Sequence, residues 1–256
     1  MSNWLQECSW KEAKELIEKS KGVAIVPVGS TEQHGYHLPL GTDTYVAITL
    51  AEAAGEETGA VLVPPAWFGW SPDHMVLPGT ISIRPEILSE YLYDIIDSLN
   101  HHGFDKIIVI NGHRIVNITW MQIAAERAQR KLGVKVRIFD PAYMSKDIVE
   151  ELDFGAVGHA EEIETSHMMY RYPEFTKLEK AVDNPIKPVE LYSVDPSYKN
   201  DTLCYVPSTI EDAKKHAKIA GGANGEPTKS SKEKGKVYHD HLVKNLVKII
   251  KTLQQE

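Results

Sequence analysis

The sequence lacks several features that define common classes of protein. Its 256 residues include only two cysteines, Cys8 and Cys204, which are too few for a disulfide framework. No apolar run approaches the roughly 18 residues that a membrane helix needs, and the first residues do not resemble a signal peptide. Acidic residues (36) outnumber basic residues (28), so the excess of positive charge typical of nucleic-acid binders is missing. We therefore expect a cytoplasmic protein with no nucleic-acid or membrane partner.

What the sequence does contain is an ordinary globular composition and many histidines. Hydrophobic residues make up 42% and charged residues 25%, which excludes a disordered, collagen-like or coiled-coil chain. The length fits one large α/β unit, and we predict a single domain over residues 1–256. The eleven histidines are notable because imidazole is the commonest metal ligand and a frequent acid or base.

Strand-like apolar runs alternate with helix-like segments along the chain. We predict strands at residues 22–29, 60–64, 106–111 and 134–139. We predict helices at residues 10–19, 43–58, 85–102, 116–132, 162–170 and 238–253. Apolar strands separated by helices indicate a mostly parallel sheet covered on both faces, which is a three-layer α/β/α sandwich. Residues 181–236, rich in Pro, Gly, Ser and Lys, are predicted to form long surface loops or a subunit interface.

Polar side chains follow all four predicted strands at their carboxyl ends. In chain order they are Glu32, His34, His37, Asp43, Ser71, His74, His113, His159, Glu162 and Glu164. In a doubly wound sheet the ligand lies outside this edge, and histidines scattered over a surface would not all follow the same edge. We therefore predict that most of this set forms one site. The remaining histidines are interpreted as exposed, at a helix end or at an interface: His101, His102, His167, His216, His239 and His241.

The residue types in this set indicate a metal centre. Carboxylates and imidazoles together suit Zn, Mn or Fe(II), and five or six such ligands exceed what one tetrahedral zinc needs. The surplus favours two divalent metal ions per chain, bridged by a carboxylate, with a hydroxide between them as nucleophile. Ser71 and His74, from the loop after the second strand, are candidates for binding the substrate.

Several motifs in this order resemble the creatininase (creatinine amidohydrolase) family. The matching segments are residues 27–43, His74 with residues 77–80, residues 111–113 with Asn117, residues 159–166, and residues 221–235. The first motif is long and specific, and the likeness extends over nearly the whole chain. The resemblance implies a three-layer α/β/α fold, a two-metal hydrolytic site and homohexamers.

Position by position, the resemblance also implies roles for single residues. Glu32 and His113 would bind one metal ion and His34 the other, with Asp43 bridging the two ions. His159 would be the acid or base near the scissile amide.

The chain departs from creatininase itself at two places. Ile115 stands where that enzyme has a glutamate that binds the second metal ion, and residues 154–158 contain no tryptophan to close over the substrate. Glu164, or else Glu162, could complete the second metal site from the fourth loop, and we favour Glu164 as a metal ligand and a catalytic residue. Both departures argue against creatinine as the substrate.

These observations favour a metal-dependent amidohydrolase that cleaves the C–N amide bond of a lactam or formamide in a small polar molecule. Within the same family, an archaeal-type formylamino-pyrimidine deformylase and a mycofactocin-type peptidase are alternatives. Ile115 also motivates a metal-binding scaffold without activity. Nucleotide binding is disfavoured, because residues 29–35 fit neither common phosphate-loop pattern and carry the acidic Glu32.

Overall fold

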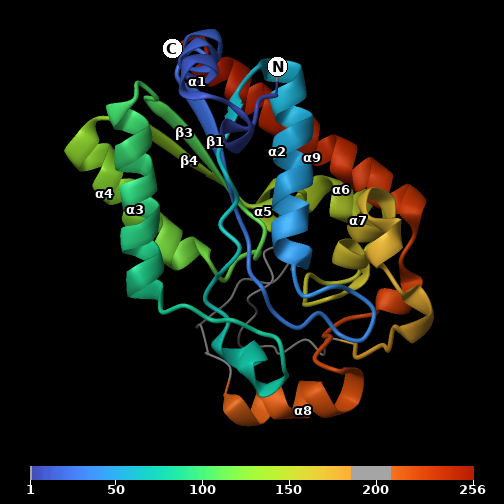
Figure 1. Cartoon of the computed structure of the whole chain (residues 1–256). Coiled ribbons are helices and arrows are strands. Elements are labelled where there is room, and N and C mark those ends of the chain that lie inside the picture. The colour runs from blue at the N-terminus through green and yellow to red at the C-terminus, as the bar shows by residue number, and fades with distance from the viewer. Residues whose placement is uncertain (1, 186–208) are drawn as a thin grey trace.

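A four-stranded parallel sheet forms the centre of the molecule (Figure 1). The computed structural model describes residues 2–185 and 209–256, so Cys204 and part of the predicted loop region lie outside the described residues. The strand order is β2-β1-β3-β4, and the bounds are β1 (Val23–Val28), β2 (Val61–Leu62), β3 (Lys106–Asn111) and β4 (Lys135–Phe139). The predicted parallel sheet is confirmed, although β2 is shorter than the five residues expected.

The central strand β1 explains why the sheet needs helices on both faces. All six of its residues are buried, and it pairs with β3 from Val23 opposite Lys106 to Val28 opposite Asn111. Because side chains alternate along a strand, Val23 and Ile25 enter one core cluster, whereas their neighbours enter the core cluster on the other face. A strand buried on both faces reads as a continuous apolar run, which is the pattern that identified it.

The helices fill two layers around this sheet. Their bounds are α1 (Trp10–Lys19), α2 (Thr42–Thr58), α3 (Pro85–His101), α4 (Ile118–Leu132), α5 (Pro141–Met144), α6 (Lys146–Glu151), α7 (Glu162–Arg171), α8 (Ile210–Ala220) and α9 (Lys232–Leu253). Short 3-10 helices are η1 (Leu5–Glu7), η2 (Pro72–Val76), η3 (Pro173–Phe175), η4 (Leu178–Lys180) and η5 (Pro227–Lys229).

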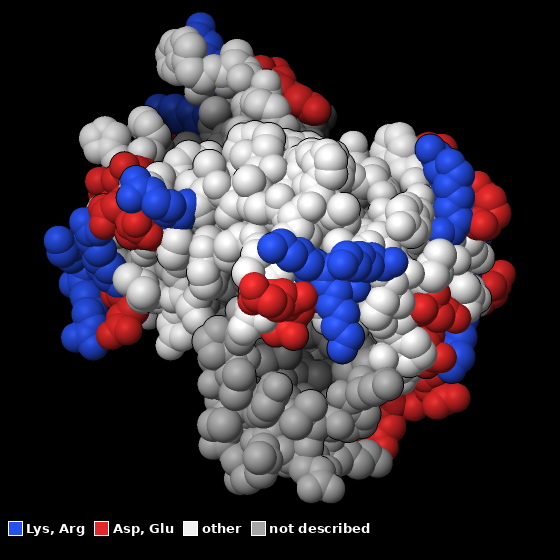
Figure 2. Space-filling view, turned by 90° about the horizontal axis from the view of Figure 1, so that it is seen from below, with Lys and Arg blue, Asp and Glu red and all other residues white. Residues whose placement is uncertain are grey.

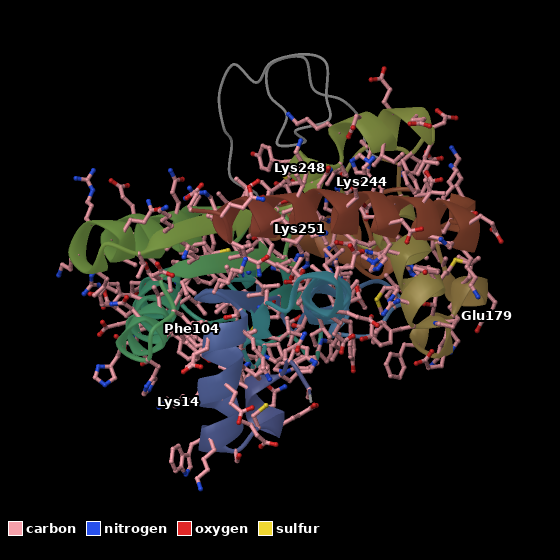
Figure 3. The ribbon with its side chains drawn as sticks, turned by 90° about the horizontal axis from the view of Figure 1, so that it is seen from above. Lys14, Phe104, Glu179, Lys244, Lys248 and Lys251 are labelled. Atoms are coloured by element: carbon pink, nitrogen blue, oxygen red, sulfur yellow. The ribbon has the colours of Figure 1, made fainter. Side chains whose placement is uncertain are left out.

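The two layers are easy to follow in Figure 1. Helices α3 and α4 lie on one side of the sheet, and α2 and α9 lie on the other, with α7 packed against α9. Seen from above, α9 carries Lys244, Lys248 and Lys251 on its exposed side (Figure 3), while its opposite side packs into the core. The three-layer α/β/α sandwich is therefore confirmed. In the described part of the chain, no helix is both long and apolar enough to span a membrane.

The region from residue 181 to residue 236 differs from the sequence prediction. Instead of loops alone, it contains α8, and α9 begins at Lys232 rather than at residue 238. Helix α8 starts at a capping box, in which Thr209 and Asp212 satisfy each other's backbone N–H groups, and ends at Gly221 in the left-handed conformation. Only Ala213 and Ala220 of α8 are buried, although apolar residues recur along it at helical spacing. The Pro, Gly, Ser and Lys of the surrounding segment led to the loop prediction.

Candidate functional site

The carboxyl ends of β1 and β3 meet the amino terminus of α2 at a buried polar cluster. Glu32 and His34 follow β1, Asp43 lies in the first turn of α2, and His113 follows β3. The backbones approach so closely that a Cβ on Gly112 would lie 1.9 Å from the carbonyl oxygen of Asp43. Glycine at this position thus allows the loop after β3 to set His113 against Asp43.

Asp43 is the centre of this cluster. Its Oδ1 lies 3.0 Å from His34 Nε2, and its Oδ2 lies 3.0 Å from His113 Nδ1. Glu32 Oε1 lies 3.4 Å from the same His113 nitrogen. All four side chains are almost completely buried. Because each Asp43 oxygen faces a different imidazole, the carboxylate can serve two neighbouring positions at once.

Glu164, in the first turn of α7, joins the cluster from the same helix layer as α2 and α9. Its Oε2 lies 3.8 Å from His34 Nε2. His34 Nδ1–H donates a hydrogen bond to the carbonyl oxygen of Glu32 at 3.1 Å, so the other ring nitrogen faces Asp43 and Glu164. Metal-binding imidazoles are commonly oriented by such a bond from the second nitrogen.

Two groups of three ligand atoms share Asp43. One is Glu32, Asp43 and His113, and the other is His34, Asp43 and Glu164, each with its atoms within 4.8 Å of one another. Among the described residues, no hydrogen bond of regular geometry reaches either carboxylate oxygen of Glu32, although the side chain is fully buried. Buried oxygens without hydrogen bonds, facing imidazoles, are the ligands expected of a cation site, so these residues could hold two divalent ions.

His159 and His74 stack over one side of the cluster, with ring centroids 4.1 Å apart. His159 Nε2–H donates to the carbonyl oxygen of Gln33 at 2.5 Å, which turns Nδ1 toward Glu32 Oε1 at 3.5 Å. The Gln33 amide contacts His74 Nδ1, and His74 Nε2 lies 3.2 Å from the same Glu32 oxygen. The two imidazoles are 15% and 20% exposed, unlike the buried ligand candidates, so a substrate could approach the cluster from this side.

Ser71, the other predicted substrate-binding residue, is buried at the base of this loop. Its hydroxyl lies 2.7 Å from the Ser30 hydroxyl, and its backbone N–H donates to the Ser82 hydroxyl. These contacts fix the start of η2, which carries His74.

Charge and burial within the cluster raise the pKa values of His34, His113 and Glu32. Burial alone would lower the pKa of His34, but the Asp43 carboxylate raises it to about 10. Glu32 and Asp43 similarly overcome burial and raise the pKa of His113 to about 9. Burial raises the pKa of Glu32 to about 7 against the pull of His113. Without a cation, the two imidazoles hold protons that compensate the carboxylates, and a bound cation would replace these protons.

The two stacked imidazoles at the open side behave in the opposite way. Burial, with the nearby His113 and His34, lowers the pKa of His74 to about 3. Burial and His74 lower the pKa of His159 well below its ordinary value. Both rings are therefore neutral at pH 7, and His159 Nδ1 is free to accept a proton.

Two residues that the sequence analysis did not assign, Arg114 and Glu161, adjoin the cluster. The buried Arg114 guanidinium pairs with both Glu161 and Glu164. A signal was present, because Arg114 directly follows His113, and Glu161 stands within the fourth motif. Glu162, the alternative to Glu164, pairs instead with Lys234, away from the cluster.

The interpretation of His167 and His239 as surface or interface residues is wrong. Both are buried between α7 and α9, with His167 Nε2 2.9 Å from His239 Nδ1. Close packing of the two helices at Gly235, where a Cβ would lie 1.9 Å from the Ser166 carbonyl oxygen, encloses the pair.

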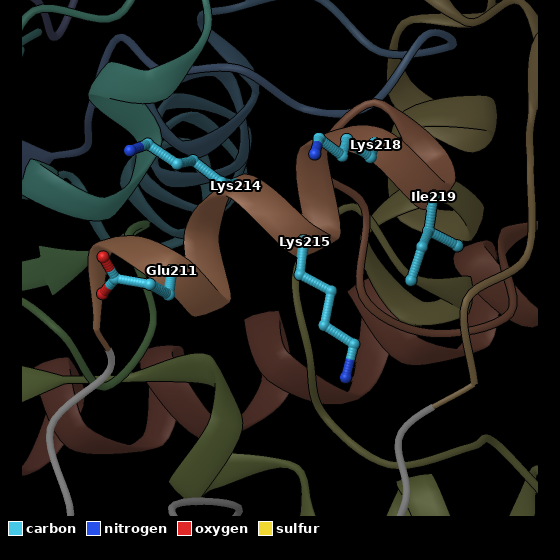
Figure 4. Close-up of a pocket in the computed structure, with 5 residues that line it drawn as sticks. All are labelled: Glu211, Lys214, Lys215, Lys218 and Ile219. Carbon is cyan, nitrogen blue, oxygen red and sulfur yellow. The ribbon is translucent and has the colours of Figure 1, made fainter.

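The outer face of α8 is positively charged, unlike the carboxylate-rich cluster at the sheet edge. Exposed lysines gather there, at the end of the molecule seen from below (Figure 2). A hollow beside the helix is lined, among the described residues, by Glu211, Lys214, Lys215, Lys218 and Ile219 (Figure 4). None of the predicted site residues lines this hollow.

Comparison with known proteins gives the chain a family. The family model Creatininase, described as creatinine amidohydrolase, matches residues 6–250. The chain is 27% identical to the creatinine amidohydrolase of Pseudomonas putida over 241 residues, covering 86% of this chain and 90% of that one.

Two other curated relatives differ in what their names describe. The chain is 29% identical to the 3-dehydro-scyllo-inosose hydrolase of Thermotoga maritima over 206 residues, covering 72% of this chain but only 61% of that relative. It is 41% identical to the mycofactocin precursor peptide peptidase of Mycolicibacterium smegmatis over 97 residues, covering 36% and 39% of the two chains.

Solved structures agree with the sequence relatives. A crystal structure of creatinine amidohydrolase (creatininase) superimposes with a TM-score of 0.82 and 26% identity, over 97% of this chain and 96% of that one. A structure described as "Creatininase Mn" gives a TM-score of 0.79 and 25% identity, over 98% of each chain. The resemblance seen in the motifs is thus confirmed: the chain belongs to the creatininase family, and the relatives named above are hydrolases.

Proposed function

We propose that this protein is a two-metal amidohydrolase for a small polar amide. The observation that carries the proposal is Asp43, shared between two groups of potential metal ligands. Glu32 and His113 would hold the first divalent ion, and His34 and Glu164 the second, with Asp43 bridging them. When bound, such ions lower the pKa of a water molecule and polarise the scissile carbonyl group. Zn, Mn and Fe(II) all suit this set of ligands.

His159 is the proposed acid–base residue. Its Nε2–H is fixed on the Gln33 carbonyl oxygen, so only Nδ1 can exchange a proton with the reacting groups. The low proton affinity of this imidazole makes it neutral before the reaction, and a proton received at Nδ1 can pass to the leaving nitrogen. His74, stacked beside it, would line the side from which the substrate approaches, and Ser71 would support the loop that carries His74.

The proposed substrates are lactams, other cyclic amides and formamides. Ile115 and the absence of tryptophan from residues 154–158 argue against creatinine itself. A formylamino-pyrimidine of the kind cleaved by archaeal deformylases would meet the same polar cluster. A peptide substrate is the second candidate, and the local 41% identity to a mycofactocin precursor peptide peptidase favours it. A scaffold without activity stays the least favoured reading.

The chelated protein provides the test. We expect activity on a panel of cyclic amides, formamides and short peptides to disappear after exhaustive chelation and to return with Mn, Zn or Fe(II). Elemental analysis of the purified protein should give two ions per chain. Activity that persists in metal-free protein, or fewer than two ions per chain after saturation, would contradict the proposal.

We also propose that the chain forms a single-domain homohexamer in the cytoplasm. Large apolar side chains on the surface support subunit contacts, because Trp67, Phe68 and Phe175 are each about two-fifths exposed. Light scattering on the full chain tests the assembly, and a monomer at micromolar concentration would contradict it.

A further inference from the structure

Arg114 is a buried cation directly beside the proposed second metal site. Its side chain is 4% exposed, and its Nη2 lies 2.8 Å from Glu161 Oε1 and 2.7 Å from Glu164 Oε1. Its Nε donates a further hydrogen bond to Glu164 Oε1 at 3.1 Å. Two nitrogens of the guanidinium therefore hold the same oxygen of Glu164 through charge-assisted hydrogen bonds.

The two oxygens of Glu164 consequently have different surroundings. Oε1 is held by Arg114, whereas Oε2 accepts the backbone N–H of Ala160 at 2.7 Å and faces His34 Nε2 at 3.8 Å. Oε2 is thus the oxygen on the side of the His34–Asp43 pair. If the Oε1 contact were lost, the carboxylate could turn about its terminal torsion, which is soft for glutamate.

Glu161 is the second partner that keeps Arg114 in position. Glu161 is buried. A Cβ added to Gly225 would lie 2.4 Å from the Cβ of Glu161, so the backbone of Gly225 packs directly against the Glu161 side chain. The segment is fixed further by the reciprocal backbone hydrogen bonds between His159 and Asn224. Two buried carboxylates bound to one nitrogen would repel each other without the guanidinium, and Glu164, which projects toward the cluster, would be displaced.

The proposed first metal site does not depend on the Arg114 side chain in this way. In the described part of the chain, the Arg114 side chain forms no ion pair with Glu32 or Asp43, and Glu164 is the proposed ligand with which it pairs. The second site, by contrast, has no glutamate from the loop after β3, because Ile115 stands there. Its carboxylate comes from α7 and is aimed by a neighbouring cation.

We propose that Arg114 is a positioning residue that holds Glu164 as a ligand of the second divalent ion, so that affinity for this ion, but not for the first, depends on Arg114. The inference rests on the proposed two-metal site. It predicts unequal effects on two binding steps, which a general loss of stability would not produce.

The experiment is a titration of the metal-free full-length protein with Mn²⁺, followed by calorimetry and electron paramagnetic resonance. Wild-type protein should bind two ions and show the exchange-coupled signal of a close pair. Arg114→Met should bind the first ion with nearly unchanged affinity and lose about tenfold or more for the second, the range typical when a partner of a ligand is removed. Its signal should become that of isolated Mn²⁺. Arg114→Lys, which keeps the charge but not the fork, should fall between the two.

Two further variants make the result specific. Arg130→Met removes an exposed arginine that pairs with Glu126 on α4, and it should bind both ions like wild type. Arg114→Met combined with Glu161→Met removes Glu161 together with its partner, so that Glu161 is not left as a lone buried carboxylate. This double variant should still lose the second ion.

The outcomes separate the two proposals. Two ions with unchanged affinities in Arg114→Met and in the double variant would overturn the role of Arg114 and leave the proposed function standing. Fewer than two ions in wild-type protein would instead overturn the two-metal site itself. An equal loss for both ions in Arg114→Met would also overturn the inference, because it would indicate a general structural role.

Discussion

Two buried histidine clusters lie in this molecule, and they differ in what surrounds them. At the carboxyl edge of the sheet, His34 and His113 face the Asp43 carboxylate. Between α7 and α9, His167 and His239 face each other, with the Thr49 hydroxyl 3.5 Å away. Burial disfavours the charged imidazole in both places.

Neighbouring carboxylates determine whether the pKa of each buried imidazole is raised or lowered. They raise the pKa of His34 to about 10 against burial, whereas burial, reinforced by Arg171, lowers the pKa of His239 to about 4. Burial and His239 likewise lower the pKa of His167 well below its ordinary value. A buried histidine is therefore a candidate ligand only where anionic groups converge on it, and elsewhere it is a neutral packing residue.

The strongest way to break this contrast is Asp43→Asn, which keeps the shape and removes the charge. We expect loss of metal binding and a fall in activity of about two orders of magnitude or more, since both proposed ion sites share this residue. In the metal-free variant, the pKa values of His34 and His113 should fall toward those of the other cluster. Elemental analysis and imidazole NMR titration measure both effects, with the exposed Asp97→Asn as control. Retention of two ions would refute the bridging role.

A matched pair of glycine substitutions separates packing from chemistry. Gly112→Ala and Gly235→Ala each place a Cβ 1.9 Å from a backbone carbonyl oxygen, the first beside Asp43 in the proposed metal-binding cluster and the second beside His167. Each should destabilise the fold by about 2–3 kcal/mol in denaturant unfolding. Only Gly112→Ala should also weaken Mn²⁺ binding. Gly155→Ala, whose nearest contact is an ordinary 3.8 Å, is the control. Equal effects on metal affinity would show that the clusters are not independent.

The two clusters should also give opposite pH dependences of stability. His167 and His239 have lowered pKa values when folded, so the unfolded chain binds more protons below pH 6.5, and stability falls as the pH drops toward 4. In metal-free protein, His34 and His113 have raised values, so their contribution is full below pH 6.5 and is lost as the pH rises through 9 to 10. Thermal unfolding between pH 4 and pH 10 measures both losses of stability, the one at acidic pH and the one at alkaline pH.

Single substitutions test which histidines cause the loss of stability at acidic pH and at alkaline pH. His239→Gln should reduce the loss of stability at acidic pH without abolishing it, because His74 and His159 also have lowered pKa values. It should leave the loss at alkaline pH unchanged, and the exposed His102→Gln should change neither. A loss at acidic pH of undiminished size in His239→Gln would show that His167 and His239 do not contribute to it.

The smallest expected effect is that of Thr49→Val. The Thr49 hydroxyl also donates to the Val46 carbonyl oxygen, and its 3.5 Å contact with His167 is long. We expect a loss of about 1 kcal/mol or less in denaturant unfolding and no change in metal affinity. A much larger loss would mean that the second cluster is a cooperative hydrogen-bond network and more than a packed pair.

Much of the fold followed from local patterns in the sequence. The apolar run at residues 22–29 located β1, and the predicted helix at residues 43–58 located α2, to within a few residues, because the burial and helix-forming patterns act over short stretches. The convergence of polar residues at one sheet edge followed from parallel strand geometry. Helix α8 was missed because the composition of residues 181–236 outweighed the helical spacing of its few apolar residues.

The sequence by itself determined the parallel sheet and the set of polar residues at its carboxyl edge, since both depend on the order of strands, helices and loops along the chain. Only the tertiary structure decided between Glu162 and Glu164. Two residues apart on α7, they point to nearly opposite sides of the helix, so one pairs with Lys234 and the other meets His34. The packing of α7 on α9 sets that rotation, and it also buries His167 and His239, which the sequence pattern alone placed outside.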